Sequence, residues 1–399
     1  MRKLLNSVLV SIMFALIACK GSVSVDSPEA ETILYDPDST AVLKADDVLE
    51  LTRVIQLETA GPSSMIGDIY QLAYTNGVFV VFDMSNKVVK IFDENGKFLR
   101  NISSHGNGPK EYLDIRSLCI TPNGNIAIVD DMKKRITEFT VDGKYVSDFS
   151  IQGYPHGVEY LNNDTLVYES ACDISADDDR INASEIYIAD RKGEIIGCFG
   201  EDMYFKTRRS DYGMSRGLLY RYCGTVFFTL LENNIIYKMN DDGTAVPKYN
   251  LQLRPKNLVP MWDKEYHTED DIMYWMTNFF EQPNFGGAFI EFEDYSIVRY
   301  TDHYHYLPML VYDHRKKQTF AVDDSGDDGV FRSFFNFSCA VMDDGHSIAC
   351  WVTPDVIRSY LQYGRIPDNE LFRKAVSEMD DESNPILLVF TFKLKNVVE

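Results

Sequence analysis

Residues 69–102, IYQLAYTNGVFVVFDMSNKVVKIFDENGKFLRNI, and residues 115–151, IRSLCITPNGNIAIVDDMKKRITEFTVDGKYVSDFSI, contain one pattern twice. In each copy an Asn-Gly pair precedes an Asp, and a later Asn-Gly or Asp-Gly pair is followed by Lys and an aromatic residue. These features recur 47 positions apart, and a fixed period of this length indicates a repeat architecture. Asn-Gly and Asp-Gly favour tight hairpin turns between the short β-branched and aromatic segments. Each copy therefore predicts about four antiparallel strands, the size of one β-propeller blade.

The repeat continues more weakly along the rest of the chain. Gly143, Gly193 and Gly243 follow one another at intervals of 50 residues. Short strand-like segments after residue 155 predict a third, a fourth and a fifth blade. Only three strands can then be found for a sixth blade, at 337–342, 347–351 and 385–393.

The strand-like stretch Val48–Leu57 precedes the first blade and has no blade of its own. We expect it to supply the missing strand of the sixth blade, because an isolated strand would leave edges that invite aggregation. This exchange between the chain ends would also close the ring. The sequence thus predicts an all-β fold, a six-bladed β-propeller over residues 48–399 that is closed by its N-terminal strand.

The predicted connections differ in length between the two faces of this disc. The turns inside the first and second hairpin of each blade are short, whereas the connections on the opposite face hold the extra residues. These inserts are 103–114, 172–184, 200–216, 254–287 and 352–384. Short helices are expected in the last two of them, at 269–280 and 356–379. Long loops on a repeat scaffold carry function more often than short turns, so this elaborated face is the predicted binding face.

The charge of the chain limits its partners. The formal net charge is −22 at pH 7. Binding to nucleic acid requires clustered Lys and Arg against phosphates, so an acidic chain of this kind argues against it. Adsorption to anionic lipid headgroups is disfavoured for the same reason.

The N-terminus has the features of a targeting segment. Arg2-Lys3 precede an apolar stretch that is short for a membrane span, and Leu16-Ile17-Ala18-Cys19 ends it. This tetrapeptide resembles the lipobox of bacterial lipoproteins, which implies removal of residues 1–18 and acylation of Cys19. The alternative is an ordinary secretory signal that ends in Cys. The polar residues 19–47 are interpreted as a tether that links the propeller to the membrane.

The segment Gly106-Asn107-Gly108-Pro109-Lys110-Glu111-Tyr112 leads into the second blade. It resembles a Gly-x-Gly-Pro-x-Glu-Tyr signature of six-bladed β-propeller lipoproteins of Bacteroides-like bacteria, and the repeats themselves resemble NHL-type repeats. The resemblance implies an outer-membrane lipoprotein. Acidic residues directly after the acylated Cys are typical of surface export, and here the first, Asp26, comes late. The periplasmic side and the cell surface therefore both stay open.

Two groups of residues are candidates for ligand binding on the elaborated face. The first surrounds the signature segment and consists of His105, Glu111 and Tyr112. A structural role is the alternative for it, with Glu111 capping backbone amides and Tyr112 packing between blades. The second group lies on the central inserts, where aromatic rings suit sugars or peptides and guanidinium groups suit carboxylates: Arg208, Arg209, Tyr212, Trp262 and Trp275. The aromatic members of this group could instead anchor an insert to the propeller.

No cysteine pair has the Cys-x-x-Cys spacing of a zinc or thioredoxin-like site. If Asp344-Gly345 forms a hairpin turn, Cys339 and Cys350 face each other across it, either as a disulfide or as two buried thiols. The acidic run that starts at Asp323 does not match the spacing of a calcium-binding loop. We therefore expect no metal and no cofactor.

The sequence contains no serine-hydrolase elbow, no zinc-protease motif and no phosphate-binding loop. We therefore expect a lipid-anchored, noncatalytic binding module for a glycan or an envelope protein. The alternative is a polysaccharide-active hydrolase or lyase whose site lies at the mouth of the central channel.

Overall fold

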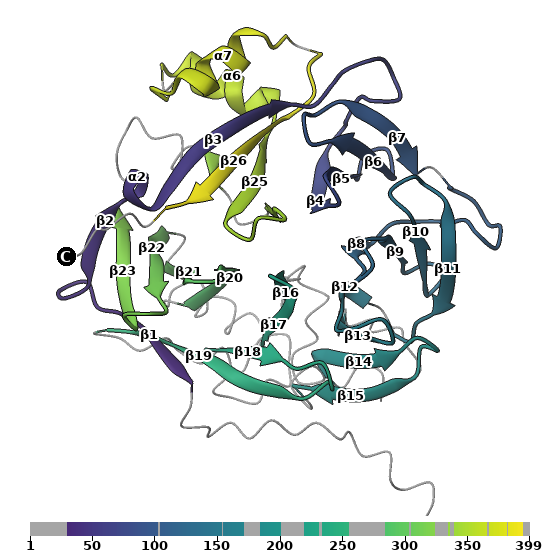
Figure 1. Cartoon of the computed structure of the whole chain (residues 1–399), viewed down its shortest axis with the longest axis horizontal. Helices are drawn as coiled ribbons and strands as arrows, with labels where there is room; N and C mark the ends of the chain where they lie inside the picture. The colour runs from purple at the N-terminus through teal and green to yellow at the C-terminus, as the bar shows by residue number, and fades with distance from the viewer. Residues whose placement is uncertain are drawn as a thin grey trace, which may run out of the picture.

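The computed structural model describes residues 30–102, 104–153, 155–170, 184–200, 219–230, 234–254, 284–302, 305–323, 334–335, 339–364, 367–380 and 382–393. The chain forms six small sheets around a central axis, which confirms the predicted six-bladed β-propeller (Figure 1). The strands β4, β8, β12, β16 and β20, whose bounds follow, lie nearest to the axis.

The first three blades are four-stranded antiparallel sheets in sequence order. Blade one consists of β4 (Ile69–Thr75), β5 (Val78–Asp83), β6 (Val88–Asp93) and β7 (Phe98–Ile102). Blade two consists of β8 (Ser117–Ile120), β9 (Ile126–Asp130), β10 (Arg135–Phe139) and β11 (Tyr145–Ser150). Blade three consists of β12 (Pro155–Tyr160), β13 (Thr165–Ser170), β14 (Ile186–Asp190) and β15 (Ile195–Phe199). The innermost strand comes first in each of them.

The last three blades each include a strand from the N-terminal region. Blade four consists of β16 (Leu219–Tyr222), β17 (Thr225–Thr229), β18 (Ile235–Met239), β19 (Ala245–Leu253) and β1 (Glu31–Tyr35). Blade five consists of β20 (Asn284–Glu291), β21 (Tyr295–Asp302), β22 (His305–Asp313), β23 (Gln318–Asp323) and β2 (Ala41–Lys44). Blade six consists of β24 (Ala340–Val341), β25 (Ser347–Val352), β26 (Ile386–Phe392) and β3 (Leu49–Gln56).

The outermost strand of blade six is the N-terminal strand that the sequence predicted. β3 pairs antiparallel with β26, and the register places Gln56 opposite Ile386 and Leu49 opposite Phe392. The ring is therefore closed by backbone hydrogen bonds between the two ends of the propeller, which satisfies donors and acceptors that an open edge would expose.

The residues before β3 correct the predicted tether. β1 pairs in parallel with β19, and β2 pairs in parallel with β23, so both extend the propeller. A four-residue helix, α2 (Ala45–Val48), joins β2 to β3. Although this region is polar in composition, a few of its side chains are buried. Ile33 is 0% exposed and Leu43 is 5% exposed. Two buried residues in β1 and one in β2 give too weak an alternation to be recognised in the sequence.

The hydrophobic core lies mainly between neighbouring blades. One cluster joins blade one to blade two and includes Phe82, Ile91, Ile128 and Phe139. Other clusters join blades two and three, three and four, and six and one, and a further cluster runs through blades four, five and six. Because each blade buries its faces against its neighbours, the ring holds the inner strands at fixed positions around the axis.

The insert between β25 and β26 contains the expected helices. They are α6 (Pro354–Gln362) and α7 (Glu370–Ser377), and they lie outside the ring beside β3 (Figure 1). The side chain of Asn369 caps α7 by accepting a hydrogen bond from Phe372 N over 3.1 Å. The stretch 269–280, which the sequence also predicted as helical, lies outside the described residues.

Candidate functional site

A cavity of about 950 Å³ occupies the axis of the propeller. Its walls are inner strands of blades one, two, three, four and six, together with the short turns that follow several of them. These turns include Pro122, Gly224 and Gly345. The cavity thus extends toward the face of short turns, opposite to the elaborated face on which the sequence placed the binding surface.

A charged pair from two blades lies in the wall of this cavity. Arg221 in β16 donates from Nε to Glu159 Oε2 in β12 over 2.8 Å. About a fifth of each side chain is exposed. Burial raises the pKa of the Glu159 carboxyl, and the charge and hydrogen bond of Arg221 oppose that rise. The pair presents fixed polar groups inside a channel whose wall is part polar and part apolar.

The same guanidinium group keeps unused hydrogen-bonding capacity. Arg221 Nη1 donates to the carbonyl O of Gly224 over 3.2 Å. Its Nη2 is buried and has no partner among the residues that the structure describes. A buried donor without a partner is costly, so a water molecule or a ligand group near this atom would be favourable.

Aromatic side chains line the same cavity as the charged pair, and two of them pack on neighbouring rings. Tyr70 is 44% exposed, and its ring packs edge-on against Phe82 at 5.5 Å. Tyr74 packs against Phe79 at 4.9 Å. The remaining large aromatic side chains of the wall are Tyr220, Tyr222 and Trp351. Rigid aromatic surfaces with a few placed polar groups are typical of a preformed ligand site.

The cavity also contains thiol groups, and their environment keeps them protonated. Burial raises the pKa of Cys119 well above its usual value, with the Glu159 charge adding to the effect. Burial likewise raises the pKa of Cys223. Reactive cysteines depend on a lowered pKa because the thiolate is the nucleophile. These two thiols are therefore poor nucleophiles.

Cys339 and Cys350 lie as the hairpin prediction placed them. The neighbouring pair Ala340 and Ala349 are opposed in the register of β24 and β25. In the structure the two thiols are joined by a hydrogen bond, which raises the pKa of Cys339. This arrangement is that of the second alternative, two facing thiols. Cys198 is disulfide-bonded, and its partner lies outside the described residues.

The signature segment has a structural role in the folded chain. Tyr112 is fully buried between blades one and two, and its hydroxyl donates to the carbonyl O of Ile102 over 2.8 Å. Glu111 Oε2 accepts a hydrogen bond from Gly108 N over 2.7 Å. A Cβ atom at Gly106 would lie 2.2 Å from the same oxygen, which explains the glycine. The side chains of Glu111 and Tyr112 thus make the internal contacts that the structural alternative describes.

Lys133 also holds this segment in place, although no motif in the sequence points to it. Its ammonium group donates to the carbonyl O atoms of Gly106, Gly108 and Glu111, at 2.7, 3.2 and 2.6 Å. The loop therefore wraps around one cation from the next blade. His105 is exposed at the edge of the loop, with its ring 6.2 Å from that of Tyr112.

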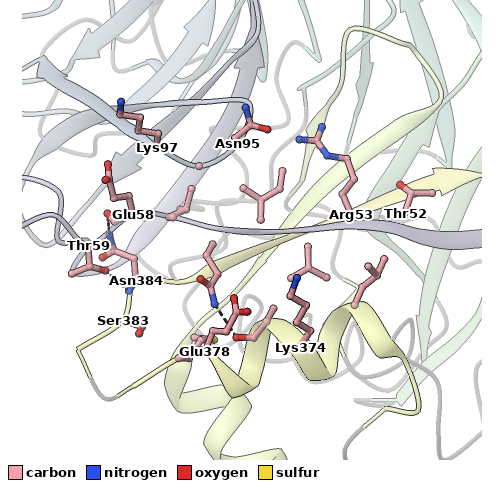
Figure 2. Close-up of a pocket in the computed structure, with 18 residues that line it drawn as sticks. Thr52, Arg53, Glu58, Thr59, Asn95, Lys97, Lys374, Glu378, Ser383 and Asn384 are labelled. Carbon is pink, nitrogen blue, oxygen red and sulfur yellow. Dashed lines mark hydrogen bonds between the residues drawn. The ribbon is translucent and has the colours of Figure 1, made fainter.

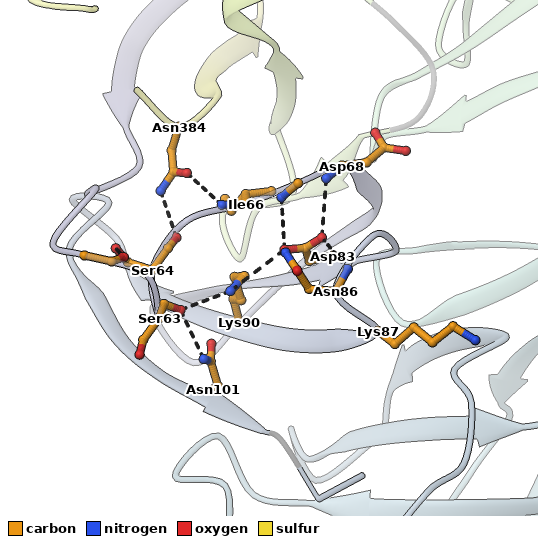
Figure 3. A network of polar contacts seen from close by, with 12 residues as sticks. Ser63, Ser64, Ile66, Asp68, Asp83, Asn86, Lys87, Lys90, Asn101 and Asn384 are labelled. Atoms are coloured by element: carbon orange, nitrogen blue, oxygen red, sulfur yellow. Dashed lines mark hydrogen bonds and ion pairs between the residues drawn. The ribbon is translucent and has the colours of Figure 1, made fainter. Parts of the chain in front are cut away.

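The repeated aspartates of blades one and two are structural as well. Asp83 is fully buried, and its carboxylate accepts hydrogen bonds from the backbone N of Gly67 and Asp68 (Figure 3). Lys90 Nζ lies 3.8 Å from it and donates to Ser63 O over 3.0 Å. In blade two, Asp130 accepts from Leu113 N over 2.6 Å. Each aspartate fixes the chain that enters the inner strand of its blade, which explains its repetition.

A buried acid lies away from the axis, between blades four and five. Glu291 accepts a hydrogen bond from Tyr249 over 3.0 Å and another from Ser296. Ser296 Oγ lies 2.7 Å from Nε2 of His314. Burial raises the pKa of Glu291 to about 7, although these hydrogen bonds oppose the rise, and burial lowers the pKa of His314. Ser296 is fully buried, so no substrate can reach it.

The other predicted site residues lie outside the described part of the chain. They are Cys19, Arg208, Arg209, Tyr212, Trp262 and Trp275. Among the described helices, none has the length and apolar character needed to cross a bilayer.

A family model described as "Domain of unknown function (DUF4934)" matches residues 33–391. The chain belongs to the DUF4934 family. No protein of curated function matches this DUF4934 sequence. The match covers the propeller together with most of β1, consistent with the N-terminal strands being part of the domain.

Two solved structures share the fold of this DUF4934 chain. A Bacteroides fragilis protein assigned as exported is 16% identical, with a TM-score of 0.69, over 91% of this chain and 99% of that one. A DUF4221 family member from Bacteroides vulgatus is 12% identical, with a TM-score of 0.50, over 87% of this chain and 99% of that one. The similarity to propellers of Bacteroides that the sequence indicated is thereby confirmed at the level of the fold.

Proposed function

We propose that this protein is a noncatalytic binding module of the cell envelope whose central cavity holds a segment of a neutral glycan. The observation that carries the proposal is that packed tyrosine rings line the same cavity as the pair Glu159 and Arg221. Sugar rings present flat C–H faces that pack on aromatic side chains, and their hydroxyl groups hydrogen-bond to carboxylates and guanidinium groups.

The charge of the cavity supports a neutral ligand. Asp343 and Asp344 line it together with Glu159, whereas Arg221 is the cation that faces them. Burial raises the pKa of Asp344, but hydrogen bonds from His346 and Ser347 lower it by more than burial raises it, so the pKa lies below its usual value and this carboxylate is ionised. An acidic sugar would meet net negative charge and bind less well.

The chemistry of the wall supports binding over the hydrolase or lyase alternative. A general acid or a nucleophile requires a pKa suited to its task and freedom to reach the substrate. Cys119 and Cys223 in the cavity have raised pKa values. The Glu159 carboxyl also has a raised pKa, and its hydrogen bond with Arg221 restrains it from reaching a substrate. Both features favour recognition of a ligand without its conversion.

Export of this chain is supported by its targeting segment, and its fold resembles that of a protein assigned as exported. Attachment to the outer membrane through an acylated Cys19 is part of the proposal and is supported by the lipobox-like residues alone. Because β1 begins at Glu31, only the eleven residues 20–30 lie between Cys19 and the propeller. Fully extended, they would reach about 40 Å, which would hold the propeller near the membrane.

Calorimetric titration with a panel of neutral and acidic oligosaccharides tests the proposed function. Tyr70→Ala should weaken the binding of a neutral oligosaccharide by about tenfold, because a stacked ring contributes roughly 1 kcal/mol or more. Tyr363→Ala is the matched control, since Tyr363 is 74% exposed at the end of α6 and far from the cavity wall. Equal affinity of both variants would contradict the assignment, as would stronger binding of acidic sugars.

A further inference from the structure

A second cavity lies on the rim of the propeller. It has a volume of about 890 Å³ and lies between β3 and α7, with the turn Asn95–Lys97 of blade one on the other side of the strand (Figure 2). The consecutive residues Thr52–Thr59 all line it. Successive side chains of a strand point to opposite faces, so a cavity that contacts every residue of a run follows the edge of the strand.

The same molecule shows how comparable edges are covered elsewhere. In blades four and five the outermost antiparallel strand is followed by one more strand, β1 or β2, which pairs in parallel. In blade six the sheet ends at β3. Near the end of β3, Gln56 Nε2 donates to Ala375 O of α7 over 2.8 Å, which joins the strand to the helix. The groove beside the rest of β3 is where a further strand would pair.

The groove is rich in cations although the protein is acidic. Arg53, Lys97 and Lys374 line it, and none of them forms an ion pair within the described ranges. Figure 2 shows Lys374 extending from α7 toward β3. Glu58 and Glu378 are the carboxylates of the lining, and Glu58 accepts a hydrogen bond from Phe98 N over 2.9 Å. In a chain of net charge −22, three unpaired cations along one edge favour an acidic occupant.

We propose that this groove is the docking site for an extended acidic segment of a partner protein, which adds to β3 as a fifth strand of blade six. Main-chain hydrogen bonds to the strand edge would provide affinity, and the cations would select carboxylate side chains. At roughly 3.3 Å per residue, the part of β3 that lines the groove, Thr52–Gln56, accommodates about five residues of such a segment. Beyond it the edge is already covered, because Glu58 N donates to the carbonyl O of Gly96 over 2.8 Å. The groove is separate from the central cavity and does not depend on the glycan proposal.

Fluorescence anisotropy with a labelled eight-residue peptide of alternating Val and Glu tests this docking site on the full chain. The acidic peptide should bind saturably and lose affinity with added salt. A peptide of alternating Val and Lys should bind at least tenfold more weakly. Binding of both peptides with equal affinity, or of neither, would overturn the proposal.

Charge reversal in the groove provides the matched comparison. Lys97→Glu combined with Lys374→Glu should weaken binding of the acidic peptide at least tenfold. Lys144→Glu is the control, because Lys144 is an exposed lysine at the equivalent turn of blade two and does not line the groove. Unchanged circular dichroism and melting temperature would show that all variants are folded. Equal affinities of the groove variant and the control would overturn the proposal.

Alternate N-methylation of the peptide tests pairing with the strand. A strand edge pairs with every second amide of its neighbour. Methylating one alternate set should therefore abolish binding, and methylating the other set should leave it unchanged. Equal effects of the two sets would overturn the addition of a strand to β3.

Discussion

The buried carboxyl of Glu291, between blades four and five, predicts a measurable pH dependence of the free energy of unfolding. Its carboxyl is buried against Tyr249 and Ser296, and its pKa is raised from 4.5 to about 7. Between these two values the native chain holds a proton that the unfolded chain has released. The stabilisation from this group is therefore fully present below pH 4.5 and is lost as the pH rises through 7.

The size of the effect follows from the shift. A difference of about 2.5 pH units at about 1.36 kcal/mol per unit gives about 3 kcal/mol between pH 4.5 and pH 7. His314 acts in the opposite direction, because its pKa is lowered from 6.5 and the unfolded chain takes up its proton first as the pH falls. Glu291→Gln removes the first contribution, keeps a hydrogen-bonding amide at the site and leaves the second.

Urea denaturation of the parent and of Glu291→Gln at pH 5, 6, 7 and 8 measures the difference in the free energy of unfolding. The parent should lose about 2.5 kcal/mol relative to the variant between pH 5 and pH 8, because all other titrating groups cancel in the difference. Glu293→Gln is the control, an exposed carboxyl in the same turn, and should give a flat difference. A flat difference for Glu291→Gln, or one of opposite sign, would refute the assignment of a buried, protonated Glu291.

Three further predictions concern the motif, the ring and the membrane. Gly106→Ala should lower the free energy of unfolding by about 1–3 kcal/mol, since its Cβ would lie 2.2 Å from Glu111 Oε2. Adding Glu111→Ala should recover part of this loss in denaturant titrations. Additive losses of the two substitutions would contradict the clash. Deleting residues 30–47 should lower the melting temperature less than deleting 30–57, because the longer deletion also removes the closing strand β3; equal melting temperatures would contradict closure. Cys19→Ser should release the protein from the membrane fraction of cells, and continued membrane association would disprove the lipid anchor.

The sequence predicted the architecture because its turn residues repeat. Asn76 and Gly77 adopt φ angles of 51° and 76°, the conformation that Asn-Gly indicated at this hairpin. The missing strand of blade six could be found by counting strands, since a closed ring leaves none unpaired. β1 and β2 escaped detection because their pairing is parallel and peripheral, and few of their side chains are buried.

The candidate site was far less predictable. Glu159 and Arg221 come from blades three and four, where the repeat has faded, and 62 residues separate them in the chain. No local spacing indicates that they meet between the inner strands of these neighbouring blades. In contrast, the Gly106–Tyr112 segment was conspicuous in the sequence, yet its hydrogen bonds are internal: Gly108 N donates to Glu111, and Lys133 donates to the carbonyl O of Gly106. The conspicuous motif therefore stabilises the conformation of a loop. The candidate site, in contrast, depends on contacts between strands that are far apart in the sequence.

The claim that the central cavity is the binding site is tested most directly by a crystal structure of the protein with the neutral oligosaccharide that binds most tightly in the titrations. We expect sugar rings packed on Tyr70 and Tyr74, with hydroxyl groups within hydrogen-bonding distance of Glu159 or Asp343. Ordered sugar on the elaborated face or on the rim, with an empty central cavity, would contradict it.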